Sequence, residues 1–260
     1  MLPKISIVTP VYNLVDFIEQ TILSVVDQAY PNLEYIVIDG GSSDGTTEII
    51  ERYKDRISVI ISEKDQGQYF ALQRGMELST GEIMGWINGD DILWPGSLNY
   101  IANKFSEQKE IQWIQGYPNV INNDGQVIYE RDPVYTKEFF LTRSYHDGRF
   151  IQQESTFWSR KLWDQAGGFI NTDYRYAADF ELWVRFFQYE SLFLTKQRLG
   201  SFRDRGEEQV SRQYFSRYLQ ECDDAIDSLD VHEPTSVLSM ILKIFKRKEE
   251  YQEPLPVYVS

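Results

Sequence analysis

The chain has 260 residues, of which 42% are hydrophobic and 25% charged, as in folded globular proteins rather than disordered ones. This length allows one large domain, or one domain with an appendage. There are 40 acidic and 26 basic residues, for a net charge of −14. Nucleic acid is therefore not expected as a partner, because neutralising its phosphates needs a concentrated basic face.

Cys222 is the only cysteine, so it can form no internal disulfide and cannot build a thiolate metal site alone. The first residues, MLPKISIVTPVYN, do not resemble a signal peptide. The sequence contains no apolar run of about 18 residues, the length that a membrane-spanning helix needs. We therefore expect a cytoplasmic protein.

Strand-like and helix-like segments alternate over the first 95 residues. Runs rich in β-branched residues predict buried strands, and apolar residues at helical spacing predict helices. The expected strands cover residues 5–11, 33–39, 57–62 and 82–88, and the expected helices cover 16–28, 44–55 and 68–79. This alternation with short connections predicts a doubly wound, largely parallel α/β sheet.

A polar cluster lies at the end of each of the four expected strands. The clusters are Thr9-Pro10, residues 39–44, residues 63–68 and residues 88–91. In parallel sheets, ligands bind outside the carboxyl ends of the strands. We therefore expect the clusters to meet at one edge and form a ligand site, rather than four unrelated turns.

The stretch MGWINGDD ends the fourth strand with two adjacent carboxylates, Asp90 and Asp91. Asn-Gly followed by polar residues is a strong signal for a hairpin turn. The other interpretation is a divalent cation, which would convert an acidic pocket into one that attracts a diphosphate. The stretch alone favours the turn, whereas its position at a shared polar edge favours the cation.

The alternation changes beyond residue 95. We expect a helix at 97–109, paired strands at 111–131 around the turn NNDG, and an irregular aromatic segment at 133–150. Further helical patterns cover 155–169, 179–190 and 212–229, and an apolar stretch at 236–245 precedes the basic residues 246–248. The sequence contains no internal repeat and no low-complexity segment.

Five motifs occur in order: ISIVTPVYN, VIDGGSSDGT, SEKDQGQYFALQRG, TGEIMGWINGDD and ADFELWVRF. Together they resemble the family 2 glycosyltransferases over residues 4–211. The resemblance implies the GT-A fold, a Rossmann-like, mixed and mostly parallel central sheet flanked by helices. It implies a domain at 1–211, with a nucleotide-binding part at 1–95 and an acceptor part at 96–211. A C-terminal helical extension and tail would follow at 212–260.

The resemblance implies that the nucleotide of a sugar donor lies against the strand ends. Tyr12 would lie against the base, and Asp39 would accept a hydrogen bond from the imide N–H of uracil while neighbouring glycines let the backbone approach. Asp44 is expected to cap the next helix instead. The implied nucleotide-binding residues are Thr9, Pro10, Tyr12, Asp39, Asp65, Arg74 and Asp90.

Asp90 and Asp91 have separate roles in the resemblance: the first would hold the ribose, and the second would face a divalent cation. Oxygen-only ligands suit Mn²⁺ or Mg²⁺. Asp179 would be the general base that takes the proton from the acceptor hydroxyl in an inverting reaction. The structural alternative for Asp179 is a helix cap. Ala178 stands where many relatives carry glutamate.

The resemblance assigns two further segments. Gln153 and Glu154 would line the acceptor and donor-sugar side, where Trp158 either stacks on a sugar or packs in the core. The loop FRDRGEEQVS resembles one that closes over the donor, so that Arg203 and Arg205 would face the diphosphate. Several relatives carry histidine in place of Arg205; arginine cannot ligate a metal but can clamp phosphate oxygens.

The implied activity is inverting, metal-dependent transfer of a sugar from a nucleotide diphosphate, UDP above all, to a hydroxyl of a saccharide or lipid-linked saccharide. The first alternative is a nucleotidyltransferase, but TPVYNLVDF lacks the glycine-rich basic loop expected there. The second is a non-catalytic nucleotide-sugar or carbohydrate-binding protein. Retention of Asp39, Asp90, Asp91 and Asp179 argues against the second.

Residues 236–248 combine a broad apolar helix face with the three consecutive bases Lys246, Arg247 and Lys248. Such a segment can pack on the domain, form a homodimer contact or dock peripherally on the anionic inner face of a membrane. Packing or a dimer contact is favoured, because the segment is short and Glu249 and Glu250 follow at once.

Overall fold

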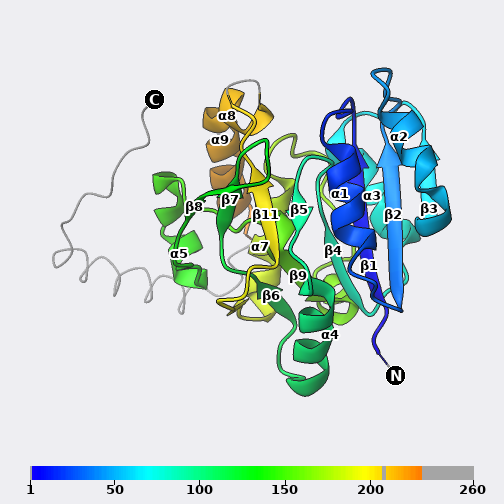
Figure 1. Ribbon diagram of the computed structural model, residues 1–260. Helices are drawn as coiled ribbons and strands as arrows, with labels where there is room; N and C mark the ends of the chain where they lie inside the picture. Colours follow the sequence, from blue (N-terminus) through cyan, green and yellow to red (C-terminus); the bar gives the residue numbers. More distant parts are fainter. Residues whose placement is uncertain (1, 207–208, 230–260) are drawn as a thin grey trace.

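The computed structural model describes residues 2–206 and 209–229. A seven-stranded sheet runs through the molecule in the order β10-β6-β9-β4-β1-β2-β3 (Figure 1). In that order the strands are Phe193–Leu194, Trp113–Gln115, Thr156–Ser159, Ile83–Trp86, Ile5–Val11, Leu33–Asp39 and Val59–Ser62. β9 pairs antiparallel with β4 and β6, and the other neighbouring strands pair parallel. The predicted mixed, mostly parallel sheet is confirmed.

Helices cover both faces of this sheet because its strands alternate between two apolar faces. Ile7, Tyr35 and Val37 face one cluster, whereas Val8 and Ile36 face the other. The first face packs on α1 (Ile18–Val26), α2 (Thr46–Arg52) and α4 (Ser97–Glu107). The second packs on α3 (Gln68–Leu78), α6 (Arg160–Gln165), α7 (Ala178–Tyr189) and α9 (Phe215–Asp227). The period of two along each strand thus produces a three-layer α/β fold.

A second, four-stranded sheet has the order β5-β11-β7-β8. Its strands are Ile92–Leu93, Gly200–Arg203, Asn119–Ile121 and Val127–Glu130. β5 follows the paired aspartates directly, and its antiparallel pairing with β11 aligns Ile92 with Ser201. This pairing brings the arginine loop at 203–205 beside the aspartates, more than 100 residues away in the chain.

Shorter elements connect these layers. They are η1 (Lys54–Arg56), α5 (Lys137–Leu141), η2 (Ser144–Asp147), η3 (Gln153–Ser155) and α8 (Val210–Gln213). η3 approaches β11 closely: a Cβ on Gly200 would lie 2.1 Å from the Glu154 carbonyl oxygen. Only glycine fits at this position, so Gly200 sets the depth at which Glu154 enters the site.

Two sequence-based expectations were wrong. The helical pattern at 155–169 contains a strand, β9, because Phe157 and Trp158 each pack on a different face of the sheet. The helix starts only at α6, where the Ser159 hydroxyl accepts from the Leu162 N–H at 3.1 Å. Of the strands expected at 111–131, β7 and β8 pair antiparallel around the NNDG turn as predicted, whereas β6 joins the central sheet instead.

Helix α9 packs against α7 through the buried residues Cys222 and Ala225. No helix among the described residues is long and apolar enough to cross a membrane. The apolar and basic stretch 236–248, with its three interpretations, lies outside the described residues.

Candidate active site

The paired aspartates form the centre of the site, between β4 and β5. Asp90 is 7% exposed and Asp91 only 1%. Asp91 Oδ1 accepts from the Arg203 backbone N–H at 2.8 Å, and Oδ2 lies 3.3 Å from the Asn88 amide and 3.4 Å from that of Gln153. Asp90 Oδ2 forms an ion pair with Arg205 Nε at 2.7 Å. Strand ends and the arginine loop therefore converge on two buried carboxylates.

A third carboxylate, Glu154, lies in the same interior and is 1% exposed. Burial raises its pKa to about 8, and the charges of Asp179 and Asp90 add to the effect. Burial also raises the pKa of Asp91, helped by the charges of Asp90 and Glu154. Burial raises the pKa of Asp90 against the opposing charge of Arg205. Such a cluster of buried acids is stabilised by a positive charge.

Arg203 holds this site together from within. Its side chain donates to the carbonyl oxygens of Asp90 at 2.6 Å and of Asn122 and Asn123 at 2.8 Å, and to Gln20 Oε1 at 2.5 Å. The residue is fully buried, so its guanidinium is committed to protein acceptors. Arg203 therefore lies beside the aspartates, and the diphosphate contact predicted for it stays a prediction.

Arg205 is the more accessible arginine of the loop. Its side chain is 25% exposed and lies over the Phe17 ring, 5.6 Å from the centroid. It lines a cavity of about 270 Å³ that is also bordered by residues 13–17, Asp44 and Asn123. Asp44 accepts from the backbone N–H groups of Val15 and Thr46, in line with the structural role expected for it. Arg205 can therefore reach an anion in this cavity while it neutralises Asp90.

Asp179 lies in the first turn of α7, partly exposed. The Tyr69 hydroxyl lies 3.3 Å from Asp179 Oδ1 and 2.7 Å from the Tyr176 carbonyl oxygen. Burial raises the pKa of Asp179 to about 6, against hydrogen bonds from the Phe180 backbone and Tyr69. A carboxylate with this pKa is suited to accept a proton near neutral pH.

Trp158 does not reach the site surface. It is fully buried and packs edge-to-face on Trp86 at 5.4 Å and on Trp183 at 5.6 Å between ring centroids. Trp113 continues this cluster, stacked on Trp183 at 5.8 Å. Of the two interpretations for Trp158, its position supports core packing.

Replacing Trp158 with alanine should therefore lower the free energy of unfolding by about 3–5 kcal/mol, the usual cost of removing a buried tryptophan. Denaturant unfolding measures this loss. Trp158→Phe retains part of the packing and should leave the donor KM unchanged. A raised acceptor KM in a fully folded Trp158→Phe protein would instead identify a sugar contact.

The residues at the end of β1 divide into buried and exposed ones. Thr9 and Pro10 are buried, and the Thr9 hydroxyl is hydrogen-bonded to the Tyr35 hydroxyl at 3.0 Å. Tyr12 is 61% exposed. Of these three predicted nucleotide-binding residues, Tyr12 is the one whose ring is free to lie against a base.

Asp39 is fully buried at the end of β2. Its carboxylate accepts from the hydroxyls of Ser42 at 2.5 Å, Ser62 at 2.6 Å and Thr47 at 3.2 Å, and from the Ser42 backbone N–H. These bonds hold the loop that contains Gly40 and Gly41, and the bond from Ser62 ties this loop to the end of β3. A uracil contact at Asp39 needs one of these donors to turn away, and it stays a prediction.

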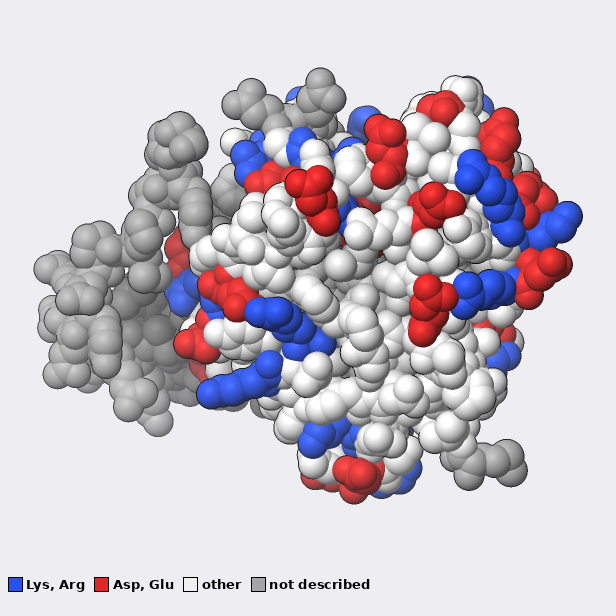
Figure 2. Space-filling view, in the orientation of Figure 1, with Lys and Arg blue, Asp and Glu red and all other residues white. Residues whose placement is uncertain are grey.

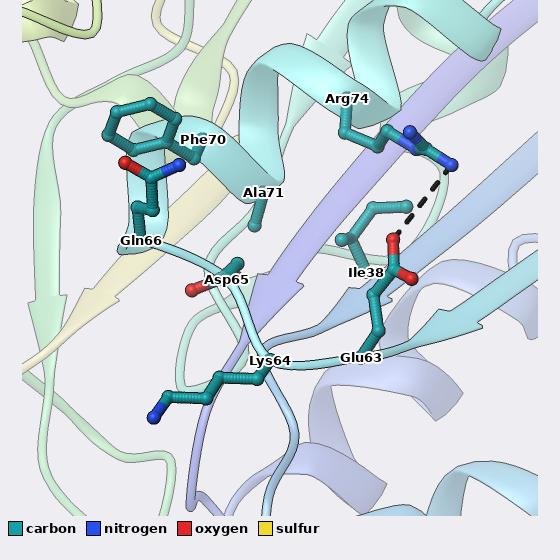
Figure 3. Close-up of a pocket in the computed structure, with 8 residues that line it drawn as sticks. All are labelled: Ile38, Glu63, Lys64, Asp65, Gln66, Phe70, Ala71 and Arg74. Carbon is teal, nitrogen blue, oxygen red and sulfur yellow. Dashed lines mark ion pairs between the residues drawn. The ribbon is translucent and has the colours of Figure 1, made fainter.

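A cavity of about 400 Å³ lies between the end of β3 and α3 (Figure 3). Asp65 and Arg74 both line it, and Arg74 faces Glu63 with 3.9 Å between the charged atoms. Asp65 Oδ1 accepts from the Gly67 N–H at 2.8 Å, and a Cβ on Gly40 would lie 2.9 Å from Asp65 Oδ2. The close approach to Gly40 joins this cavity to the end of β2.

The remaining charges are spread over the surface. On the face drawn in Figure 2, acidic and basic side chains are interspersed around the margins, and the centre carries few of either.

A family match follows the same strands. The profile described as Glycosyl transferase family 2 matches residues 6–165, which span β1 to α6 and contain the paired aspartates. The chain belongs to glycosyltransferase family 2.

Two curated relatives illustrate the range of this family. An uncharacterized glycosyltransferase of Rickettsia prowazekii is 28% identical over 202 residues, covering 76% of this chain and 63% of the relative. A Campylobacter jejuni enzyme named GalNAc(5)-diNAcBac-PP-undecaprenol beta-1,3-glucosyltransferase is 29% identical over 142 residues, covering 53% of this chain and 42% of the relative. The chain thus spans less than two thirds of the length of these relatives.

Solved glycosyltransferase structures share the fold. The S. aureus TarS fragment 1–349 in complex with UDP-GlcNAc superposes with a TM-score of 0.71 at 15% identity, covering 95% of this chain and 72% of that one. The mannosyltransferase PcManGT from Pyrobaculum calidifontis, in complex with GDP-Man and Mn²⁺, has a TM-score of 0.59 at 14% identity, covering 95% and 80%. At these identities the match supports the GT-A-type fold alone.

The oxygen donors around Asp91 fit a hard divalent cation. Gln153 Oε1 and Glu154 Oε1 are buried and have no hydrogen-bond partner within the described part of the chain. Carboxylate and amide oxygens are the ligands that Mg²⁺ and Mn²⁺ prefer. No group of three or more Asp, Glu, His or Cys residues that could hold a metal occurs among residues 2–206 and 209–229.

Sequence reasoning missed three residues of this site. Gln68 donates to Asn88 Oδ1 at 2.7 Å and links α3 to the aspartate turn; both lie in the polar clusters noted above. Tyr69 follows Gln68 directly on α3. In the sequence it reads as one more apolar residue of this helix, so nothing there indicates a contact with Asp179. Glu221 contacts the segment before Asp179 from α9, and nothing in the local sequence signals this long-range contact.

Proposed function

We propose that this family 2 glycosyltransferase moves a sugar from a nucleotide diphosphate, with UDP as the first candidate, to an acceptor hydroxyl with inversion. The observation that carries the proposal is the cluster of three buried carboxylates, Asp90, Asp91 and Glu154, with the charge of Asp179 acting on Glu154. The complexes of the two structural neighbours, with UDP-GlcNAc and with GDP-Man and Mn²⁺, support a nucleotide-sugar donor. Domain limits of 1–211 and 212–260 are part of the proposal.

The donor would lie across the carboxyl ends of β1 to β4. Tyr12 is exposed for stacking on the base, and Asp65 and Arg74 line the adjoining cavity. Thr9, Pro10 and Asp39 would shape this side from beneath, since all three are buried. Arg205 would bind the diphosphate from the opposite cavity, and Arg203 would hold the loop that carries it.

We propose Mn²⁺ or Mg²⁺ as the cofactor, held by Asp91, with Gln153 Oε1 as a further oxygen donor. When bound, the cation would supply positive charge to the leaving diphosphate. Asp90 is then left to the donor ribose and Arg205, in keeping with its ion pair at 2.7 Å.

Asp179 would act as the general base. Its carboxylate would take the proton of the acceptor hydroxyl while that oxygen bonds to the anomeric carbon. The bond from this carbon to the diphosphate oxygen breaks on the opposite face, so the configuration inverts. Positioned proton transfer of this kind contributes about 10²- to 10⁴-fold. Gln153 lies beside Asp91, and the charges of Asp179 and Asp90 both act on Glu154, which supports the proposal that Gln153 and Glu154 face the sugar.

We propose a saccharide or a lipid-linked saccharide as the acceptor, on the side formed by residues 96–211. The Campylobacter relative, whose printed name contains a polyprenol-linked acceptor, supports this class. A cytoplasmic location, with peripheral membrane contact or a homodimer through the C-terminal helices, belongs to the same proposal.

Sugar transfer should lose activity as the pH falls. Asp179 must be ionised to accept a proton, and its pKa is raised to about 6 by burial. kcat/KM should therefore be nearly constant above pH 7 and fall about tenfold per pH unit well below 6. A stopped assay of nucleotide release in constant-ionic-strength buffers measures this limb. An unchanged rate at pH 5, with the protein folded, would contradict the role of Asp179.

A donor screen tests the proposed function. UDP- and GDP-linked sugars are incubated with the protein and either Mn²⁺ or EDTA, and nucleotide release is measured together with the melting temperature. We expect one donor class to raise the melting temperature and to be hydrolysed slowly in the presence of Mn²⁺. If no nucleotide sugar stabilises the protein or is consumed, the proposed function is wrong.

A further inference from the structure

Helix α7 begins without a side-chain cap of its own. Its N-cap position is Ala177, which cannot accept a hydrogen bond through its side chain. The first N–H groups of a helix have no partners within the helix and need an acceptor from elsewhere. Because Asp179 lies in this first turn, the contacts that hold the start of α7 also set the position of its carboxylate.

Glu221 on α9 holds the segment that leads into this turn. Its carboxylate accepts from three consecutive backbone N–H groups: Arg175 at 3.1 Å, Tyr176 at 2.8 Å and Ala177 at 2.9 Å. Hydrogen bonds to a carboxylate are stronger than those between neutral groups. A single side chain from the C-terminal helix therefore fixes the whole segment that enters α7.

Tyr69 holds the same segment from the other side. Its hydroxyl lies 2.7 Å from the Tyr176 carbonyl oxygen, while the Tyr176 N–H donates to Glu221. Tyr176, three residues before Asp179, is thus held at both polar groups of its backbone: its N–H donates to Glu221 on α9, and its carbonyl oxygen accepts from the Tyr69 hydroxyl on α3. The same hydroxyl lies 3.3 Å from Asp179 Oδ1, so Tyr69 contacts both the held segment and the Asp179 carboxylate.

We propose that Glu221 is a positioning residue for Asp179: α9 holds the proposed base in place through the segment 175–177. This inference rests on the proposed function, because it assumes that Asp179 is the base. It assigns a part in sugar transfer to α9, which lies outside the segment matched by the family profile, residues 6–165.

Contacts other than those of Glu221 also hold α9 in place. Asp227 forms an ion pair with Arg143 at 2.6 Å, and Asp223 accepts from the Tyr145 hydroxyl at 2.7 Å. Cys222 and Ala225 are buried against the core. A substitution at Glu221 should therefore leave the helix docked and change only the held segment.

The charge of Glu221 also acts on the titration of Asp179. It adds to the burial that raises the pKa of Asp179 to about 6. The other titratable groups that face Asp179 are Tyr69 on α3, Glu154 on η3, and Tyr218 and Cys222 on α9. Neutralising Glu221 removes one of the negative charges, so the pKa of Asp179 should fall.

The test compares Glu221→Gln and Glu221→Ala with Asp224→Asn. Asp224 is an exposed carboxylate on the same helix and makes none of the bonds to residues 175–177, so its variant removes an equal charge without touching the segment. Two measurements are made on each protein. One is the titration of the Asp179 side-chain carboxyl carbon by NMR, and the other is kcat and KM against pH for the best donor from the screen.

We expect Glu221→Ala to lower kcat about 10- to 100-fold with the donor KM within twofold, because small misplacements of a reacting group cost this much. Glu221→Gln should lower kcat less and move the acid limb, and the Asp179 titration, to lower pH. Asp224→Asn should have the same kcat and the same Asp179 titration as the parent protein. If the Glu221 variants only melt earlier, with the parent titration and kcat, the positioning role is wrong.

The two measurements separate this inference from the proposed function. If the parent protein turns over no nucleotide sugar, the proposed function fails, but the NMR titration still reports whether Glu221 holds Asp179. A shifted titration in Glu221→Gln that is absent in Asp224→Asn then supports the contact. Identical titrations in all three proteins overturn it.

Discussion

Replacing Asp179 with asparagine should lower sugar transfer by about 10²- to 10⁴-fold while leaving UDP affinity nearly unchanged. Asparagine keeps the shape of the side chain but cannot accept the proton of the acceptor hydroxyl. UDP affinity should survive because the proposed nucleotide contacts lie on β1 to β4, away from α7. The measurement is kcat and KM from nucleotide release, with UDP affinity from calorimetry.

The helix-cap alternative for Asp179 gives a different result. A capping residue is worth about 1 kcal/mol, so its loss would lower the melting temperature and leave turnover largely intact. Asp179 accepts from the Phe180 backbone N–H, as a cap would, whereas Glu221 holds the segment before the helix, so turnover decides between the two roles. Glu181→Gln is the matched control: Glu181 is a carboxylate in the same helical turn, but it pairs with Arg185 at 2.8 Å. It should retain turnover.

The second large effect is expected at Asp91. Asp91→Ala should abolish sugar transfer and weaken UDP binding, because the cation would lose its only carboxylate ligand in the proposal. Asp91→Asn is the gentler variant, since its carbonyl oxygen can still accept from the Arg203 N–H. It should remove most of the Mn²⁺-dependent part of UDP binding while the protein stays folded.

Calorimetry with UDP in Mn²⁺ and in EDTA measures this second effect. The parent protein should bind UDP at least tenfold more tightly in Mn²⁺, and Asp91→Asn should show little difference between the two conditions. Asp55→Asn, an exposed aspartate on η1, controls for the change in net charge. Equal UDP affinity of the parent with and without metal would disprove the assignment of a cation to Asp91.

The sequence was most informative where local rules act. Alternating β-branched strands and amphipathic helices predicted the first four strands and the helices between them, and polar residues after each strand indicated the edge where we propose that the donor binds. Asp90 and Asp91 lie at that edge as expected. In this part of the chain the buried faces of strands and helices determine both the spacing of apolar residues and the fold, so the spacing predicts the fold.

Prediction was weaker where a residue depends on a distant partner. Whether Trp158 stacks on a sugar or packs in the core depends on Trp86 and Trp183, which approach it only in the folded sheet. Arg203 looked like a free phosphate ligand, but its acceptors lie near residues 20, 90 and 122. Glu221 is 42 residues from Asp179 in the chain, and only helix packing brings them together.

A crystal structure of the protein with UDP and Mn²⁺ tests the central claim most directly, because that claim concerns where the donor binds. We expect the diphosphate beside Asp91 and Arg205, with Mn²⁺ bound to the Asp91 carboxylate and the base near Tyr12 and Asp65. UDP bound away from the ends of β1 to β4, or bound there with no metal at Asp91, would contradict the account.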